Sequence, residues 1–313
     1  MGLKQMNEQV LGISSGAGAY LVWGLLPIYW KLLDSVPSLE VLAHRIVWSF
    51  GFMVLVLLAT RQLIVFRKDF YGIVLLPKKF ILIVMAAIII SINWLTYIWA
   101  VSNDRIIETS LGYYINPLVS VCFGIIVLKE KLSFWQIVSF CLAAAGVANM
   151  AYHFGSVPWV SLILAFSFAV YGLLKKIINL GAITGITLET LIILPVSLIY
   201  LVYLHTMGIA SFGHGPPEIS GLLLGAGVVT AVPLLLFAGG ANRLPLSVVG
   251  FLQYIAPTIA LVIGVYLYHE PFTTVHLSSF IFIWVALTVF SLSKTKLFVE
   301  LENHFKKIAL KAK

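Results

Sequence analysis

The sequence predicts an all-α membrane protein with ten transmembrane helices arranged as two inverted five-helix repeats. Composition is the first reason: the 313 residues are 61% hydrophobic and only 10% charged, whereas a soluble domain needs more charge to cover its surface. The second reason is a pattern of Tyr, Ile, Pro, Gly and Glu that occurs twice with the same spacing. The matching pairs are Tyr114/Tyr254, Ile115/Ile255, Pro117/Pro257, Gly124/Gly264 and Glu130/Glu270.

Ten apolar stretches are long enough to cross a membrane, because about 20 helical residues span the roughly 30 Å hydrocarbon core. The predicted spans are 10–31, 39–60, 80–102, 107–128, 134–152, 157–174, 185–204, 219–240, 246–267 and 274–293. Lys175 and Lys176 adjoin an apolar run, so the edges of the sixth and seventh spans are the least well defined. The first stretch is too long for the apolar region of a signal peptide, and we interpret it as a retained helix.

The positive charges predict the orientation of the chain. With ten spans, almost all Lys and Arg residues fall on the side of the two termini, while Lys31 and Arg105 fall on the other side. Cytoplasmic loops carry such an excess of positive charge, so we expect both termini to be cytoplasmic. The net charge of +8 is then explained by orientation in the membrane, and it does not indicate a nucleic-acid partner.

The repeat covers both halves of the chain, and each half has an odd number of spans. The second half must therefore enter the membrane upside down relative to the first, an arrangement that gives two nearly equal packings, each open to one side. Further matching segments are Trp23-Gly24-Leu25 with Tyr171-Gly172-Leu173, Leu39-Glu40 with Leu188-Glu189, and Arg105 with Arg243. The expected divisions are an N-terminal tail (1–9), a first repeat (10–153), a second repeat (154–294) and a basic C-terminal tail (295–313).

Several segments carry a resemblance to a known family. They are WGLLPIYWKLL, HRIVWSF, NWLTYIWAVSN, ETSLGYYINPLVS, LAFSFAVYGLLKK and GFLQYIAPT. Together with ten spans in two homologous halves and a Glu closing the fourth and ninth helices, the chain resembles the EamA family of the drug/metabolite transporter superfamily. The resemblance implies a bacterial inner-membrane transporter of small metabolites, without specifying a substrate. Many family members have Gly before that Glu, where this chain has Lys129 and His269, so no role of that Gly is carried over.

The second span contains three ionisable side chains, Glu40, His44 and Arg45. A charge at the centre of a membrane helix costs roughly 2.5–3.5 kcal/mol on insertion scales, so such residues are candidates for a substrate pathway. We expect Arg45 to bind an anionic group, and Glu40 and His44, which share a helix face, to pair with it or carry protons. In the alternative interpretation, Arg45 reaches the membrane interface and Glu40 neutralises it.

Other polar and aromatic residues lie mid-span on shared helix faces and are predicted to line a substrate cavity. The full set of cavity candidates is Trp23, His44, Arg45, Asn93, Trp94, Tyr97, Tyr113, Asn116, Tyr171, Gln253 and Tyr254. The alternative for the amides is a structural hydrogen bond to a neighbouring helix, worth about 0.6 kcal/mol. Pro117 and Pro257 are expected to kink their helices and free a backbone carbonyl beside the cavity. Trp30, Trp135 and Trp159 lie near helix ends, which is typical of interfacial belts.

The remaining acidic and cysteine residues have simpler interpretations. Glu189 is a third proton-coupling candidate, or it favours the positive end of the seventh helix dipole. Glu130 and Glu270 are expected to accept N–H groups at the start of the next helix. Cys122 and Cys141 lie mid-span without a Cys/His cluster nearby, so we predict neither a disulfide nor a metal site, and no cofactor.

No catalytic or nucleotide-binding motif is present in the sequence, so neither an enzyme nor an ATP-driven pump is expected. The predicted function is secondary transport of small metabolites or drug-like compounds by alternating access. Because Arg45 is the one Lys or Arg residue well inside a predicted span, we hypothesise a substrate with a carboxylate. The alternatives are a membrane-embedded binding or sensory protein, for which an output domain is missing, and an enzyme on a lipid-linked substrate, for which the loops are too plain. The oligomeric state is not indicated.

Overall fold

The computed structural model describes residues 3–128, 133–154, 157–241, 243–244, 252–293, 295 and 298–300. Regular structure in these ranges is helical throughout, which confirms the all-α prediction for the described residues. The helices are α1 (Leu3–Lys31), α2 (Ser38–Ala59), α3 (Leu63–Val74), α4 (Pro77–Ser102), α5 (Ile106–Leu128), α6 (Phe134–Phe154), α7 (Trp159–Ile178), α8 (Ala182–Thr206), α9 (Pro217–Ala241), α11 (Ile255–Val262), the π-helix η1 (Ile263–Leu267) and α12 (Thr274–Leu292).

Eight helices of the described chain are long and apolar enough to cross a membrane: α1, α2, α4, α6, α7, α8, α9 and α12. The chain is thus a multi-pass membrane protein by the length and composition of its helices. Helix α5 has 23 residues at the position of the fourth predicted span. Helices α11 and η1 form a shorter apolar helix, Ile255–Leu267, in the ninth. Because residues 246–251 lie outside the described ranges, the count of ten spans stays a prediction.

Helices α7 and α8 extend beyond the spans predicted for them. Lys175 and Lys176 belong to the last turn of α7, where positive charge is stabilised by the negative end of the helix dipole. The helix then ends at Asn179, whose left-handed backbone, with φ 54° and ψ 55°, is a common C-terminal stop. The two lysines therefore belong to the last turn of the helix, beyond the apolar stretch that was predicted as the span.

Helix α3 was not expected from the apolar stretches, because it is short and amphipathic. Phe66 and Phe70 pack against a cluster that contains Ile83 of α4 and Leu188 of α8, while Ile64 is 82% exposed. Helix α3 has 12 residues, too few to cross the bilayer, and its apolar and charged faces suit a position along a membrane interface. The signal was the spacing of its aromatic residues, which a search for long apolar runs ignores.

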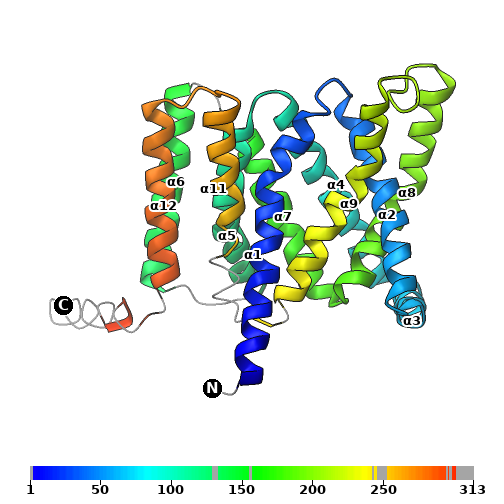
Figure 1. Ribbon diagram of the computed structural model, residues 1–313. Coiled ribbons are helices and arrows are strands. Elements are labelled where there is room, and N and C mark those ends of the chain that lie inside the picture. Colours follow the sequence, from blue (N-terminus) through cyan, green and yellow to red (C-terminus); the bar gives the residue numbers. More distant parts are fainter. Residues whose placement is uncertain are drawn as a thin grey trace.

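The packing joins helices that are distant in the sequence. Helix α1 packs against α9 and α11, and α7 packs against α4 and α5. Helix α2 contacts α8 and α9, while α8 also contacts α4. Figure 1 shows α6 and α12 side by side at one edge of the bundle, in agreement with their contacts. Helix α1 begins and α12 ends at the same end of the bundle.

Glycines allow the backbones of α9 and its neighbours to touch. A Cβ atom on Gly227 would lie 2.3 Å from the carbonyl carbon of Trp48 in α2. A Cβ on Gly240 would lie 2.7 Å from the amide nitrogen of Gly16 in α1. Small residues at such crossings are typical of packed membrane helices, and they bring α9 of the second half against α1 and α2 of the first.

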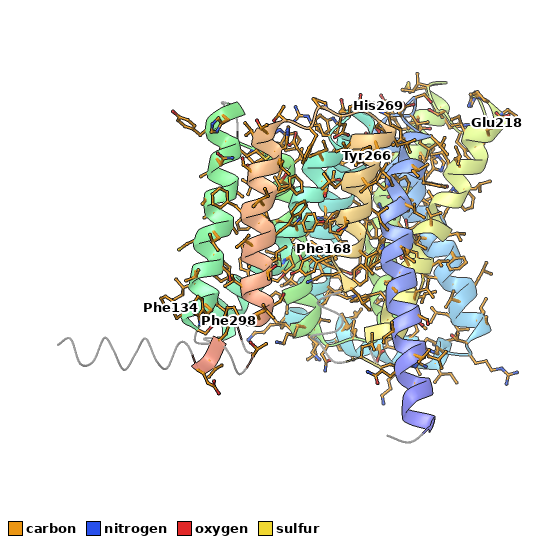
Figure 2. All side chains as sticks on the ribbon, turned by 60° about the vertical axis from the view of Figure 1, so that its left-hand side comes forward. Phe134, Phe168, Glu218, Tyr266, His269 and Phe298 are labelled. Atoms are coloured by element: carbon orange, nitrogen blue, oxygen red, sulfur yellow. The ribbon has the colours of Figure 1, made fainter. Side chains whose placement is uncertain are left out.

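The bundle has two ends that carry different loops. In Figure 2, Glu218 and His269 lie at one end, Phe134 and Phe298 lie at the other, and Phe168 lies between them. By the orientation predicted from the positive charges, the first is the external end and the second the internal end. These two names are used below for the two ends.

Candidate functional site

Arg45 is buried in the middle of an aromatic cluster. Its side chain is 4% exposed. The Cζ atom lies 4.1 Å from the ring centroid of Trp94 in α4 and 5.0 Å from that of Trp30 in α1. A cation over an indole face gains about 2 kcal/mol or more when it is desolvated. The two indoles therefore hold the guanidinium in place while leaving its N–H groups available.

Three buried donors at this cluster have no hydrogen-bond partner among the described residues. They are Nε and Nη1 of Arg45 and Nε1 of Trp30. A buried polar group without a partner costs about 1–3 kcal/mol, and more when it is charged. All three are donors, so the group that would satisfy them is an acceptor, and an anionic oxygen suits the charge of Arg45. The binding of an anion by Arg45 stays a prediction.

Glu40 directs its carboxylate away from Arg45. The side chain is 0% exposed, and it accepts hydrogen bonds from the backbone N (2.7 Å) and Oγ (3.0 Å) of Ser211 and from the backbone N of Phe212 (3.3 Å). These donors belong to the loop between α8 and α9. The geometry therefore differs from the alternative in which Glu40 neutralises an interfacial Arg45.

His44 lies on the same face of α2 as Glu40. Its Nδ1 accepts a hydrogen bond from Nε1 of Trp48 at 3.2 Å, which places the proton of a neutral ring on Nε2. The ring packs on Phe212, with centroids 4.9 Å apart and an interplanar angle of 33°. His44 and Glu40 thus contact the α8–α9 loop, whereas Arg45 contacts α1 and α4.

The two candidate amides contact the backbone of α7. Asn93 donates to the carbonyl oxygen of Leu164 (3.1 Å) and to Oγ of Ser167 (2.8 Å), and its Oδ1 accepts from the hydroxyl of Tyr113 at 3.5 Å. Asn116 donates to the carbonyl oxygen of Ala165 at 3.0 Å. These bonds match the structural alternative for the amides, and their role in a cavity stays a prediction.

Two tyrosines complete the surroundings of Arg45. The rings of Tyr97 and Tyr113 pack edge to face, with centroids 5.8 Å apart, and both are close enough to interact electrostatically with Arg45. The structure therefore brings five cavity candidates into one connected group through the contacts above. The members are Arg45, Trp94, Tyr97, Tyr113 and Asn93.

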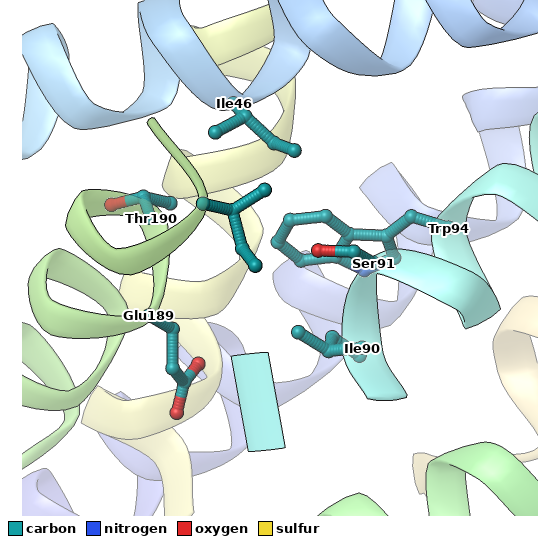
Figure 3. Close-up of a pocket in the computed structure, with 7 residues that line it drawn as sticks. Ile46, Ile90, Ser91, Trp94, Glu189 and Thr190 are labelled. Atoms are coloured by element: carbon teal, nitrogen blue, oxygen red, sulfur yellow. The ribbon is translucent and has the colours of Figure 1, made fainter. Parts of the chain in front are cut away.

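A narrow crevice lies between Trp94 and the second half of the chain. It is lined by Ile46, Ile90, Ser91, Trp94, Glu189, Thr190 and Ile193 (Figure 3). The Glu189 carboxylate accepts hydrogen bonds from the hydroxyl of Tyr171 and from Nζ of Lys175, both at 2.8 Å. Glu189 is 4% exposed, so an ion pair with Lys175 accompanies its burial at the internal side of the crevice.

The other candidates make their described ring contacts elsewhere. Trp23 packs against Tyr20 and Phe237, with ring centroids 5.3 and 5.6 Å apart. Tyr254 stacks on Tyr114, with centroids 6.2 Å apart, and Gln253 is partly buried beside it. Trp23 also packs against the hydrophobic cluster that contains Trp30 and Tyr97, whereas Gln253 and Tyr254 lie just before the start of α11.

The prolines occupy different positions in their helices. Pro117 lies inside α5, which continues to Leu128. Pro257 lies in the first turn of α11, where the missing N–H would have no helical partner in any case. Its carbonyl oxygen accepts a hydrogen bond from Oγ of Ser110 at 2.7 Å. The predicted kinks and freed carbonyls stay predictions.

Glu270 accepts the helix-terminal N–H groups expected of it, but on another helix. Its two carboxylate oxygens accept from the backbone N of Ile106 (2.6 Å) and of Ile107 (2.8 Å) at the start of α5, whereas α12 begins with its own cap at Thr273. Burial raises the pKa of the Glu270 carboxyl above its usual range, and these two N–H donors oppose that shift. Glu130 lies outside the described residues.

Sequence reasoning missed Trp30 and Lys175 as parts of the site. Trp30 was assigned to an interfacial belt, but its side chain is 0% exposed and contacts Arg45. Its position seven residues after Trp23 places both on one face of α1, and this spacing was the available signal. The pairing of Lys175 with Glu189 depends on how α7 and α8 pack, which no local pattern reveals.

Comparison with known proteins identifies the family. The sequence matches the EamA-like transporter family over residues 10–152 and 156–292. This chain belongs to the EamA family. The resemblance drawn from its sequence segments is therefore confirmed, and with it a transporter family of multi-pass membrane proteins.

Individual relatives are similar to this EamA protein over nearly its whole length. The uncharacterized transporter YojE of Bacillus subtilis is 49% identical, covering 93% of this chain and 97% of its own. Protein RarD of Escherichia coli is 42% identical, covering 93% and 96%. A solved structure titled "Crystal structure of protein" has a TM-score of 0.57 at 15% identity, covering 92% of this chain and 99% of its own, and shows the fold alone.

Proposed function

We propose that this EamA protein is a secondary transporter of the bacterial inner membrane that moves small metabolites or drug-like compounds by alternating access. The observation that carries the proposal is the buried guanidinium of Arg45 with two unpartnered nitrogens. A static scaffold has no use for such a group, because it destabilises the fold. The relative YojE, which is named an uncharacterized transporter and is 49% identical, supports the same function.

The packing of the helices supports two inverted repeats. Exchanging each helix of one half for its counterpart (α1 with α7, α2 with α8, α4 with α9, α5 with α11) converts the α1–α9 contact into α7–α4. The same exchange converts α2–α9 into α8–α4 and α1–α11 into α7–α5, and all six contacts are present. The family also matches the chain twice. Paired halves of this kind give the two alternative packings that alternating access requires.

The proposed substrate carries a carboxylate. The planar guanidinium of Arg45 suits a carboxylate in shape and charge, and the unpartnered Nε1 of Trp30 supplies one more donor. The indole faces of Trp30 and Trp94 on either side of the guanidinium favour an apolar or flat body next to that charge. Uncharged compounds of the same shape would leave Arg45 unpaired and should bind much more weakly.

Transport is driven by the substrate gradient or by protons. Among the proton-coupling candidates Glu40, His44 and Glu189, the last has the strongest geometric support, because Glu189 lines the crevice next to Trp94. Its partner Lys175 holds the carboxylate in place.

The proposal is tested by counterflow in proteoliposomes. Vesicles containing the purified protein are loaded with one member of a panel of small carboxylic acids, and uptake of the labelled form is followed, with the matching uncharged amides as controls. We expect saturable uptake of at least one acid and none of its amide. Uptake of the amides as fast as the acids would contradict the proposed anion site. Counterflow of no compound would favour a binding protein that does not transport.

A further inference from the structure

Two buried carboxylates connect the two halves of the chain at the external end. Glu40, in the first half, accepts hydrogen bonds from Ser211 and Phe212 in the second half. Glu270, in the second half, accepts from Ile106 and Ile107 in the first half. The two side chains are 0% and 6% exposed. Each carboxylate therefore fastens backbone of the opposite half out of contact with water.

The Glu40 contact holds down the middle of the α8–α9 loop. Ala210 is buried, and Ser211 and Phe212 are partly buried, whereas the flanking loop residues are exposed. Gly208 and Gly213 have φ values of +68° and +78°, a backbone region that glycine adopts readily and other residues avoid. The loop is thus attached at its centre and bends at glycines on each side.

Phe212 adds an aromatic contact to this attachment. Its ring lies 4.9 Å from the ring of His44 and 6.3 Å from the ring of Trp48, centroid to centroid. Both partners belong to the face of α2 that carries Glu40. Lifting the loop would therefore break three hydrogen bonds and separate this aromatic group at the same time.

The Glu270 contact lies in a second group of external residues. Nζ of Lys31, at the end of α1, lies 2.6 Å from Oδ1 of Asp104 and 5.9 Å from the ring centroid of Tyr268. Asp104 and Glu108 both act electrostatically on Glu270. Contacts of Lys31 thus join the end of α1 to the residues just before α5 and just after η1, next to the Glu270 contact.

The internal end differs in its ion pairs. At that end, among the described residues, Arg243 of the second half pairs with Glu8 of the first half at 2.9 Å. The two side chains are 40% and 56% exposed. The buried pair at that end, Lys175 with Glu189, lies within the second half. Exposed ion pairs contribute little to stability. Among the described residues, the buried carboxylates that join the two halves therefore lie at the external end.

We propose that Glu40 and Glu270 are two clasps of an external gate, closed in this conformation, and that both must release before the Arg45 site opens to the outside. The inference rests on the proposed alternating access and adds the residues that control it. On release, water would take the place of the backbone N–H donors at both carboxylates. Water would likewise take the place of the carboxylates at the freed backbone N–H groups. The gate acts on the conformation and is independent of the identity of the substrate.

The test follows access to the crevice from each side of the membrane. Ser91, which lines the crevice, is replaced by Cys after Cys122→Ala and Cys141→Ala, and labelling by a membrane-impermeant thiol reagent is timed in right-side-out and inside-out vesicles. We expect Glu40→Ala and Glu270→Ala each to raise the external rate about tenfold and to lower the internal rate. The reciprocal change separates a shifted equilibrium from general loosening, which would raise both rates.

Glu218→Ala is the matched control, because Glu218 is also an acid at the external end (Figure 2) but is an exposed residue in the first turn of α9. This variant should leave both rates unchanged. Glu40→Gln and Glu270→Gln, which keep one acceptor oxygen, provide variants that fold if the Ala forms do not, and should give an intermediate shift. Folded clasp variants with wild-type rates would overturn the gate. A wild-type reporter that is labelled from one side only would instead overturn alternating access itself.

Discussion

Replacing Arg45 with Met should stabilise the protein while removing its ability to bind an anion. The side chain is 4% exposed, and its Nε and Nη1 have no partner among the described residues. Met has a similar length and no polar group to satisfy, and it fills irregular apolar spaces well. If Arg45 is kept for function, the substitution should therefore remove an energetic burden from the fold.

The magnitude follows from the contacts of Arg45. Two unpartnered donors cost about 1–3 kcal/mol each, and burial of the charge adds several kcal/mol. The contacts with Trp30 and Trp94 return about 2 kcal/mol each. The balance favours Met by about 1–4 kcal/mol, the range found when buried ion pairs are replaced by apolar residues.

The assay is thermal unfolding in detergent without added ligand. A gain of 1 kcal/mol raises Tm by roughly 2–4 °C for chains of 150–250 residues, so the gain of about 1–4 kcal/mol corresponds to a rise of about 2–16 °C. Arg105→Met is the matched control, because Arg105 is 40% exposed and pairs with Glu108 at 3.3 Å, and it should change Tm little. A fall in Tm for Arg45→Met would show that Arg45 is a structural residue and refute the reasoning.

Two further predictions concern other contacts. Gly227→Ala should destabilise the protein by more than about 2 kcal/mol, because its Cβ would lie 2.3 Å from the carbonyl carbon of Trp48; a wild-type Tm would contradict this. Glu189→Ala should cost about 1–3 kcal/mol by leaving Lys175 and its buried surroundings without the acceptor, and the double variant with Lys175→Ala should recover part of that loss in Tm.

The helices were predictable because hydrocarbon imposes a length and a composition on each span. The apolar stretches predicted α2, α4 and the apolar part of α1, Glu8–Lys31, to within a few residues, and the same rule overlooked α3. That helix suits a position along an interface, where periodic placement of residues such as Phe66 and Phe70 replaces a continuous apolar run. Amphipathic patterns must therefore be searched for separately.

Only those residues of the site that are unusual by themselves could be predicted from the sequence. Arg45 was identifiable because a charge inside a span is rare and expensive. Its neighbour Trp30, and the partners of Glu40 and Glu270, depend on contacts between segments more than a hundred residues apart in several cases. Such pairings arise from tertiary packing, and a single sequence contains no local signal for them.

The most direct test of the central claim is the flux of an anionic substrate in proteoliposomes containing wild type, Arg45→Ala or Arg105→Ala. We expect saturable flux for wild type and for Arg105→Ala, because the side chain of Arg105 is 40% exposed and lies outside the Arg45 group. Flux should fall at least about tenfold for Arg45→Ala, a difference of 1.4 kcal/mol or more. Equal flux in all three proteins would contradict an anion site at Arg45.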